Sequence, residues 1–410
     1  MRILIVNTSE TAGGAAIAAS RLTEALNRHG VKAEMLVRDK HTDRITTATA
    51  GHALCYRWAF IWERARIWLA NRLNRNGLWR VDIANAGVDI TDTEEFRKAD
   101  VVHLHWVNQG MLSLRQIGKM LDCGKRVVWT MHDMWPCTAI CHHAGQCDRY
   151  HTHCHTCPQL QHPASRDLSY SVFARKLQLY SRHHITFVAC SQWLQAEAMK
   201  SRLLQGQRVM AIPNTYNAAV FHPSDQQAAR RRHHLPEQGR LLLFACQKVT
   251  NPQKGLQLLI DALQLVQDSD VALVVVGQMA EKVATSLTHP VHRIGYISDQ
   301  SDMAALYCAV DAFVTPSLEE NLPNTIMEAM ACGTPCVGFA TGGIPEMIAH
   351  RQNGYVAAYR DAEDLARGIC YVLDGDNRQR LSQAAAAAAT AQWNEQRVTQ
   401  QYIKVYEQSY

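Results

Sequence analysis

The 410-residue sequence has no apolar run close to the ~20 residues that a membrane-spanning helix needs. Its first residues, Met1 to Asn7, read as a short apolar strand and lack the features of a secretion signal. We therefore expect a cytoplasmic protein without a transmembrane helix. Thiols stay reduced in the cytoplasm, so the 13 cysteines do not indicate a disulfide framework.

A strong charge of either sign is also absent. The 42 Lys and Arg residues against 37 Asp and Glu residues give a formal net charge of +5. A balance this weak, spread over the whole length, argues against a nucleic-acid partner. The hydrophobic share of 47% argues against disorder, and at ~150 residues per domain the chain should fold into two or three domains.

Short apolar segments alternate with helical patterns along the chain. The predicted strands of the first half are 2–7, 101–105, 126–131, 185–190 and 208–212. Those of the second half are 241–245, 271–277, 291–295, 312–315 and 335–339. A turn at 11–14 leads into an Ala-rich helix at 15–29. Apolar strands separated by helices predict parallel sheets covered on both faces, so the fold class is α/β with two doubly wound, Rossmann-like domains.

The character of the sequence changes after Pro213. We expect residues 1–213 to form the first domain, with a Cys- and His-rich insertion at about 137–158. The stretch 215–239 reads as a connection, and residues 214–385 should form the second domain. Residues 386–410 should form a C-terminal helix that packs back towards the first domain. In such sheets ligands bind at loops that follow the strands, so these loops should carry the site.

The segment 315–346 is the most site-like part of the chain. A strand ends near Thr315, and a helix is expected to start at Pro323 or Asn324. Free N–H groups at such a helix start can hold an anion. Glu328 would lie one turn into the helix, where a carboxylate can accept hydrogen bonds from two ribose hydroxyls, and Glu320 would line the same ligand from the preceding loop. The alternative is that both carboxylates are solvated surface groups.

Several motifs in order give this sequence a resemblance to a known family. Glu320 and Glu328 form an E-x7-E pattern, and four further elements precede it: Gly13-Gly14, His103-Leu104-His105-Trp106, His132-Asp133 and Lys254-Gly255. Ser191-Gln192-Trp193 and Ile212-Pro213-Asn214 fit the crossing between the domains. This arrangement resembles the large retaining GT-B glycosyltransferase family, glycosyltransferase family 4, typified by glycogen and sucrose-phosphate synthases. It implies two Rossmann-like domains facing a central cleft.

The resemblance implies roles for the matching positions. Lys254 would pair with the donor diphosphate, Glu328 would bind the ribose, and Asn324 at the helix start would belong to the donor site. Glu320 would contact the donor sugar near the reacting carbon. His132 would contact sugar hydroxyls or line the face that the acceptor attacks. Gly13 and Gly14 would let the backbone come near a phosphate or the acceptor.

One departure concerns the second cation. The family places an Arg before the lysine loop, whereas this sequence has Cys246-Gln247-Lys248, so Lys248 would substitute for it or be solvated. Two Asp-x-Asp patterns, at 268–270 and 374–376, fall in turns or loops. We therefore expect no catalytic metal.

Five cysteines fall within 21 positions after His132-Asp133. Cys141, Cys147, Cys154 and Cys157 supply four soft ligands that end in C-x-x-C, as in zinc knuckles, whereas Cys137 stands outside the set. We expect a structural Zn²⁺; reduced thiols and an iron–sulfur cluster are the alternatives, and neighbouring histidines can replace a ligand. The segment resembles an insertion in bacterial exopolysaccharide transferases of the colanic-acid type. It should shape the acceptor pocket.

Residues 54–80 combine tryptophan and arginine. Trp58, Trp62 and Leu69 recur at helical spacing, and six arginines lie between 57 and 80. Two interpretations stand: a helix that contacts an anionic membrane surface, or an amphipathic helix packed on its own domain.

We expect a hexosyltransferase-type enzyme that moves a sugar from a nucleotide-diphosphate donor, with retention, to a glycan or polyprenyl-linked glycan acceptor in exopolysaccharide biosynthesis. It would work in the cytoplasm, at the inner face of the cytoplasmic membrane if residues 54–80 bind there. The alternatives are a GT-B sugar-nucleotide epimerase and a zinc-dependent binding module without transferase activity.

Overall fold

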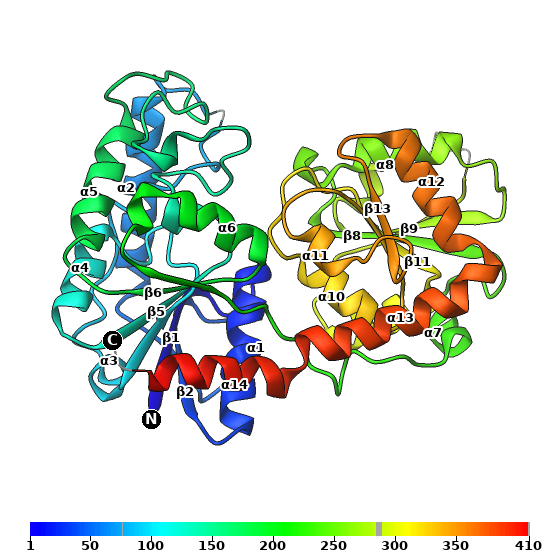
Figure 1. Cartoon of the computed structure of the whole chain (residues 1–410), viewed down its shortest axis with the longest axis horizontal. Helices are drawn as coiled ribbons and strands as arrows, with labels where there is room; N and C mark the ends of the chain where they lie inside the picture. The colour runs from blue at the N-terminus through cyan, green and yellow to red at the C-terminus, as the bar shows by residue number, and fades with distance from the viewer. Residues whose placement is uncertain (76, 284–288, 409–410) are drawn as a thin grey trace. The chain divides into compact units, whose positions relative to one another are not determined.

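The computed structural model describes residues 1–75, 77–283 and 289–408. The chain divides into two compact units, one made of Met1–Pro213 with Gln396–Tyr410 and the other of Asn214–Glu395. Each unit is an α/β layered structure with its own parallel sheet (Figure 1). Over the described ranges, no helix combines the length and apolar character needed to cross a membrane.

The first unit is built on a seven-stranded sheet in the order β3-β2-β1-β4-β5-β6-β7, with every pairing parallel. The strands are β1 (Arg2–Ser9), β2 (Lys32–Asp39), β3 (Thr47–Thr49), β4 (Val101–Leu104), β5 (Arg126–Met131), β6 (Thr186–Ala189) and β7 (Arg208–Ala211). The helices are α1 (Gly14–Arg28), α2 (Ala53–Ala70), α3 (Glu94–Lys98), α4 (Leu114–Asp122), α5 (Leu168–Tyr180), α6 (Gln192–Lys200) and α14 (Glu395–Glu407), with 3-10 turns η1 (Trp135–Cys137), η2 (Arg149–His151) and η3 (Arg202–Leu204).

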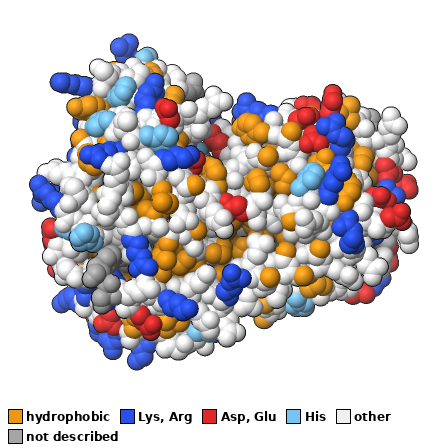
Figure 2. Space-filling view, in the orientation of Figure 1, with side chains coloured by type: hydrophobic (Ala, Val, Ile, Leu, Met, Phe, Trp, Pro, Cys, Tyr) orange, Lys and Arg blue, Asp and Glu red, His pale blue; other side chains and the backbone are white. Residues whose placement is uncertain are grey.

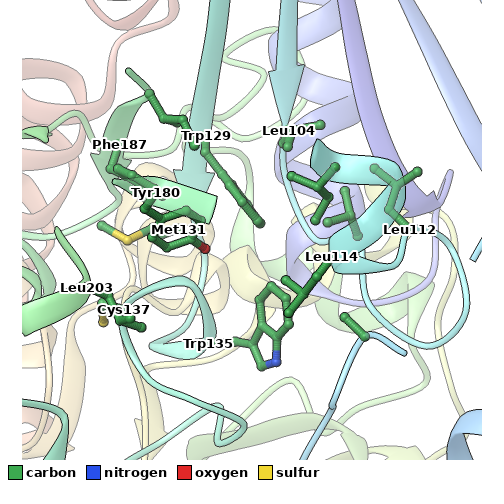
Figure 3. Packing of buried hydrophobic residues seen from close by; sticks show 14 of the residues in the cluster. Leu104, Leu112, Leu114, Trp129, Met131, Trp135, Cys137, Tyr180, Phe187 and Leu203 are labelled. Carbon is green, nitrogen blue, oxygen red and sulfur yellow. The ribbon is translucent and has the colours of Figure 1, made fainter. Parts of the chain in front are cut away.

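Alternate residues of β1 point to opposite faces of this sheet, because side chains alternate along a strand. Ile3 and Ile5 join a core with α1 and α14, whereas Leu4 and Val6 join a larger core with α2 to α6. Figure 3 shows part of the larger core, where Trp129 of β5 lies near Trp135, Tyr180 and Phe187. This packing fixes the carboxyl end of β5, directly before His132.

The second unit has a six-stranded parallel sheet in the order β10-β9-β8-β11-β12-β13. Its strands are β8 (Arg240–Lys248), β9 (Val271–Gln278), β10 (Val291–Ile294), β11 (Ala312–Thr315), β12 (Cys336–Phe339) and β13 (Gly354–Ala357). Its helices are α7 (Gln226–Arg232), α8 (Leu256–Leu265), α9 (Gln300–Ala309), α10 (Asn324–Ala331), α11 (Ile344–Met347), α12 (Ala362–Leu373) and α13 (Gly375–Trp393), with 3-10 turns η4 (Pro252–Lys254) and η5 (Ala280–Lys282). Helices α8 and α12 supply apolar residues to one core of this sheet.

The α/β class and the two parallel-sheet units agree with the sequence prediction. Three strands were not predicted: β2, β3 and β13. Strand β2 mixes charged and apolar residues, and the other two have only three or four residues, so none of them gives a continuous apolar run.

The boundary expected after Pro213 agrees with the division into units, but two other expectations were wrong. The stretch 215–239 is part of the second unit, because it carries α7 and the buried Arg230, which donates to Asp311 Oδ2 at 2.8 Å. The last helix does not begin at 386: α13 runs to Trp393 in the second unit, and α14 begins at Glu395. The Ala-rich stretch continues the earlier helix because alanine has the best helix propensity and nothing in it ends a helix.

Candidate active site

In the second unit, two loops that follow strands are held together by a glycine. Gly255 has a φ of +71°, and a Cβ at this position would lie 1.9 Å from the Pro316 carbonyl oxygen. The Leu318 N–H also donates to the Gln253 carbonyl at 2.8 Å. The loop after β8 therefore lies directly against the loop after β11, and this close approach requires glycine.

The paired loops bring Lys254 to Glu320. Lys254 Nζ donates to Glu320 Oε2 at 2.7 Å, with side-chain exposures of 32% and 18%. The Glu320 charge raises the pKa of Lys254 above its ordinary value, against the effect of burial. The ammonium is thus a fixed positive charge at a partly open position, where a ligand anion can compete for it.

Helix α10 begins at Asn324, one of the two predicted starting positions, and the Asn324 side chain accepts a hydrogen bond. Asn214 Nδ2 donates to Asn324 Oδ1 at 3.0 Å. Pro323 precedes the helix without a side-chain cap, so the first N–H groups of α10 receive no hydrogen bond from a capping side chain. This is the local arrangement that suits an anionic ligand.

Glu328 is buried, with 6% exposure, on the second turn of α10. The Tyr307 hydroxyl donates to Glu328 Oε2 at 3.2 Å. Burial and the Glu328 charge raise the pKa of Tyr307 well above its ordinary value, so this hydroxyl remains a donor. The alternative that Glu328 is a solvated surface group is wrong, because its carboxylate is buried. A buried carboxylate needs hydrogen-bond donors in place of water, and the Tyr307 hydroxyl is one of them.

The turn after β12 also depends on a glycine. A Cβ on Gly342 would lie 1.7 Å from the Glu320 carbonyl oxygen, and the Gly343 N–H donates to the Asn321 carbonyl at 2.8 Å. Glu320 is therefore held from two sides. Lys248, by contrast, is exposed at the end of β8, next to Gln278 of β9 in the strand register.

In the first unit, the loop between β1 and α1 is shaped by Gly13. Its φ is +92°, and a Cβ there would meet no atom within 4 Å. Gly13 is the N-cap of α1 and Gly14 its first residue, so the helix starts at an open position without a capping side chain. The space around Gly13 would accommodate a ligand, and the predicted role of the two glycines stays a prediction.

His132 lies at the carboxyl end of β5 in a stack of three histidine rings. The ring centroids of His103 and His105 are 4.4 Å apart, and those of His105 and His132 are 5.0 Å apart. Burial lowers the pKa of His132 to about 4 and of His103 to about 3, and it lowers that of His105 well below the ordinary value. All three rings are therefore neutral at pH 7.

Both ring nitrogens of His132 face protein atoms. Nε2 lies 2.8 Å from His105 Nδ1, and Nδ1 lies 3.5 Å from the Cys190 sulfur. The contact of Nδ1 with the Cys190 sulfur is longer and weaker than the contact of Nε2 with His105. A substrate hydroxyl would therefore lose less free energy by displacing the contact at Nδ1. His103 is held at both nitrogens, by Tyr406 of α14 and by Thr130, at 2.7 Å each.

Asp133 belongs to a buried ionic network that sequence reasoning missed. His142 lies 2.7 Å from Asp133 and 2.6 Å from Asp82, one ring nitrogen facing each carboxylate. Burial raises the pKa of Asp133, but the charge and hydrogen bond of His142 outweigh it and lower the pKa to about 2. Asp133 also accepts from Trp106 Nε1 at 3.0 Å.

The network continues to α2. Arg64 pairs with Asp82 and with Glu63, and Glu63 Oε1 accepts from the Ile83 and Ala84 N–H groups at 2.8 and 2.7 Å. Asp82 stands in a short apolar stretch that matches no motif, so only its burial in the folded chain reveals its role. The buried face of α2 thus carries, beside its apolar residues, two charged side chains that are tied to the His132-Asp133 loop.

The other face of α2 carries large apolar side chains in solvent. Half of the exposed large hydrophobic residues in the described part of the chain lie between 54 and 79: Leu54, Trp58, Ile61, Trp62, Leu69, Leu73 and Trp79. Arg57, Arg66, Arg72, Arg75 and Arg80 are exposed in the same segment, whereas its one acidic residue before Asp82, Glu63, is buried. The second interpretation required Trp58 and Trp62 to pack on their own domain, and their exposure shows that they do not.

The four clustered cysteines predicted as metal ligands come together. Cys141, Cys147, Cys154 and Cys157 are free thiols that line one enclosed cavity of about 20 Å³. Cys137 is buried outside this cavity, and its thiol lies 3.2 Å from the Met134 carbonyl. Within the described ranges, no group of three or more His, Cys, Asp or Glu side chains is already arranged to hold a metal ion.

Family comparisons match both units. Residues 12–220, just over half of the chain, match the family described as Glycosyltransferase Family 4. Residues 239–375 match the family described as Glycosyl transferases group 1. The matched segments contain the histidine stack and the Lys254–Glu320 pair, respectively.

Individual proteins resemble the chain more distantly. The phosphatidyl-myo-inositol mannosyltransferase of Mycobacterium leprae is 27% identical over 250 residues, which is 59% of this chain and 64% of that protein. The chain spans between about a third and two thirds of the length of the first curated relatives it matches.

Two solved structures share the fold over 99% of this chain. They are sucrose-phosphate synthase from Thermosynechococcus elongatus, with a TM-score of 0.67, 18% identity and 98% of that chain covered, and Anabaena HepE in complex with UDP-glucose, with a TM-score of 0.65, 17% identity and 99% covered. The fold is that of the GT-B glycosyltransferases, and the chain belongs to glycosyltransferase family 4.

Proposed function

We propose that this protein transfers a sugar from a nucleotide-diphosphate donor to a glycan acceptor, with retention of the anomeric configuration. The observation that carries the proposal is the second-unit arrangement of Lys254, Glu320 and Glu328 around the uncapped start of α10. It offers an ammonium, a helix start without a capping side chain and a buried carboxylate within one set of adjoining loops.

The chemistry follows from the charges that form during transfer. When the bond between the anomeric carbon and phosphate breaks, negative charge builds on the diphosphate and positive charge on the sugar ring. Lys254 and the start of α10 would stabilise the first charge by preorganised electrostatics, and Glu320 would stand near the second. Glu328 would accept hydrogen bonds from the ribose. No step in this scheme draws on a divalent cation.

His132 would contact the sugar as a neutral ring. Because burial keeps it uncharged, it would offer a hydrogen bond through Nδ1 and add no positive charge beside the developing oxocarbenium ion. The epimerase alternative has no observation of its own in its favour. A zinc-dependent binding module would leave the Lys254–Glu320 pair without a role.

The acceptor is proposed to be lipid-linked, in polysaccharide biosynthesis, and presented at the cytoplasmic face of a membrane. Exposed Trp58 and Trp62 are 69% and 57% accessible and stand one helical turn apart on α2, bordered by exposed arginines. Figure 1 places α2 at the upper left, behind α5 and the neighbouring loops, and the surface that Figure 2 shows there mixes basic, His and hydrophobic side chains; the exposed face of α2 itself carries the tryptophans and arginines named above. Such a face suits an anionic lipid surface.

A thermal-shift panel tests the donor. The purified chain is mixed with UDP, GDP and ADP, with their glucose or mannose conjugates, and with the matching monophosphates as controls. We expect one diphosphate series to raise the melting temperature of the second unit by about 5 °C or more at saturating concentration, and the monophosphates to raise it less. The same sugar nucleotide should then release its diphosphate in the presence of acceptor. Stabilisation by none of the diphosphates would contradict the proposal.

Vesicle flotation tests the lipid surface. The wild-type chain should float with vesicles of anionic phosphatidylglycerol and phosphatidylcholine, less so at high salt, and poorly with phosphatidylcholine alone. The double variant Trp58→Ser/Trp62→Ser should lose most of this binding. Met199→Ser removes an exposed apolar side chain from α6 of the same unit and should bind as the wild type does. Equal flotation of the double variant would overturn this part of the proposal.

A further inference from the structure

Residues 138–167 form a long connection with little regular structure. Between the end of η1 at Cys137 and the start of α5 at Leu168, the segment contains one 3-10 turn, η2, and an isolated bridge from Cys141 to Val81. Long segments of this kind inside a compact domain are uncommon, because few ladder hydrogen bonds hold them. Something other than secondary structure must fix this connection.

Four thiols converge within it. Cys141, Cys154 and Cys157 are 7–8% exposed, and with the partly buried Cys147 they line the same enclosed cavity. Its volume of about 20 Å³ is close to the space of a single water molecule or ion. All four cysteines are unpaired with one another as disulfides.

We propose that Cys141, Cys147, Cys154 and Cys157 bind one structural Zn²⁺ in a tetrahedral four-thiolate site. Four S–H bonds break, four Zn–S bonds form and four protons pass to solvent, with no change of oxidation state. Four thiolates are the ligand set of closed structural zinc sites. Because the thiols are not yet at bonding geometry around a common point, binding also requires their side chains to close on the ion.

Positive charge stands near the proposed site. Arg149 lines the cavity, and the buried Lys176 interacts electrostatically with Cys141 and Cys154. A zinc ion with four thiolates carries a net charge of −2, so a cation such as Arg149 beside it offsets part of the cost of burying it. Lys176 is itself fixed by the Trp135 and Thr138 carbonyls, at 2.5 and 3.0 Å.

The ion would also hold a residue of the active-site loop. His142 directly follows Cys141 and bridges Asp133 and Asp82. Fixing the Cys141 sulfur restricts the backbone at the next residue, so the zinc site would position His142 beside the His132-Asp133 motif without touching the substrate. This inference does not depend on the proposed transferase activity.

Metal analysis of the full-length chain tests the inference. The wild-type protein, purified without chelator, should contain about one zinc per chain. Cys154→Ser and Cys141→Ser should lose most of it, whereas Cys123→Ser, an exposed thiol on the same unit, should retain it. Growth with Co²⁺ should give the strong near-ultraviolet sulfur-to-cobalt absorption of a thiolate site, absent from Cys154→Ser.

A second measurement covers variants that fail to fold. Zinc released from the wild-type chain by a mercurial thiol reagent should reach one equivalent, and a chelator should lower the melting temperature of the first unit by about 5 °C or more. A wild-type chain without zinc after growth in zinc-supplemented medium would overturn the proposal. So would two disulfides among these cysteines by mass spectrometry, or iron and sulfide in place of zinc.

Discussion

The predicted site residues of the first unit, around His132, and those of the second unit, around Lys254 and Glu320, differ in how far their charged side chains are buried and paired. Around His132 the histidine rings are buried and neutral, and the neighbouring ionic groups, Asp133, His142 and Asp82, satisfy one another. In the second unit Lys254 and Glu320 form a partly open pair. In the first group the ionic side chains are already paired with one another, whereas the second is a pair that a ligand anion can divide.

This difference has a physical reason. A buried charge without a partner costs several kcal/mol, so the charged groups behind the His132 loop must be satisfied before any substrate arrives. A partly exposed ammonium loses little when it changes partners, because water and Glu320 already share it. We therefore predict that substitutions in the ionic network behind His132 lower the free energy of unfolding, and that substitutions in the Lys254–Glu320 pair lower the rate of turnover.

The largest effect should follow from breaking the buried network at Asp82. Asp82→Ala leaves the buried Arg64 guanidinium and the His142 ring without the carboxylate that they share, and should lower the free energy of unfolding of the first unit by about 3–5 kcal/mol. Urea unfolding followed by hydrogen exchange within this unit measures it. Asp89→Ala is the control, because the Asp89–Lys119 pair is exposed and should contribute about 1 kcal/mol or less. Equal effects of the two variants would show that Asp82 is not structural.

The next effect concerns Glu328. Glu328→Ala should raise the donor concentration needed for half-maximal transfer by about 100-fold, because losing the hydrogen bonds of two ribose hydroxyls to a carboxylate costs about 3 kcal/mol. Initial rates of diphosphate release over a range of donor concentrations measure it. Glu319→Gln changes a neighbouring carboxylate outside the predicted set and should leave the rates unchanged. A Glu328→Ala variant with wild-type kinetics would remove this residue from the donor site.

Dividing the Lys254–Glu320 pair should separate activity from stability. Lys254→Met should slow turnover about 10-fold or more, while the free energy of unfolding changes by about 1 kcal/mol or less because the pair is partly exposed. Lys254→Arg keeps the charge and should recover part of the rate. Arg367→Met, which removes the exposed partner of Asp364, serves as the control in the same unit. If Lys254→Met lowered the free energy of unfolding but not the rate of turnover, the pair would be structural and the prediction would be wrong.

The last expected effect is the pH dependence of the histidine stack. Folding lowers the pKa of His132 to about 4 and of His103 to about 3 from an ordinary value of about 6.5, so the unfolded chain binds more protons in this interval. Stability contributed by each ring is therefore complete above pH 6.5 and falls by about 1.4 kcal/mol per pH unit as the pH drops towards the folded pKa. The free energy of unfolding of the wild type and of His103→Gln should be measured from pH 7 to 4.5. Its slope against pH should be smaller in the variant by the contribution of one histidine. The exposed His52→Gln should keep the wild-type slope.

Much of the fold could be predicted because its signals are local. Continuous apolar runs such as Val271 to Gly277 identify buried parallel strands, and the change after Pro213 marks the division between the units. Strand β2 escaped prediction because its charged residues interrupt the run, and α7 because its arginines resemble a polar linker. Arg230 is buried only because Asp311, 81 residues later, comes to meet it.

The α/β class, the spacing of Glu320 and Glu328, the glycines at 13 and 255 and the clustering of four cysteines can all be read from the sequence, since each depends on residues close together in the chain. The folded chain alone reveals that Asp82, His142 and Arg64 form one network, that Tyr406 holds His103, and that Trp58 and Trp62 face solvent. These are contacts between segments distant in sequence, or exposures set by what a helix packs against. No local pattern encodes them, because a side chain's ionisation and partners depend on which remote groups the fold brings to it.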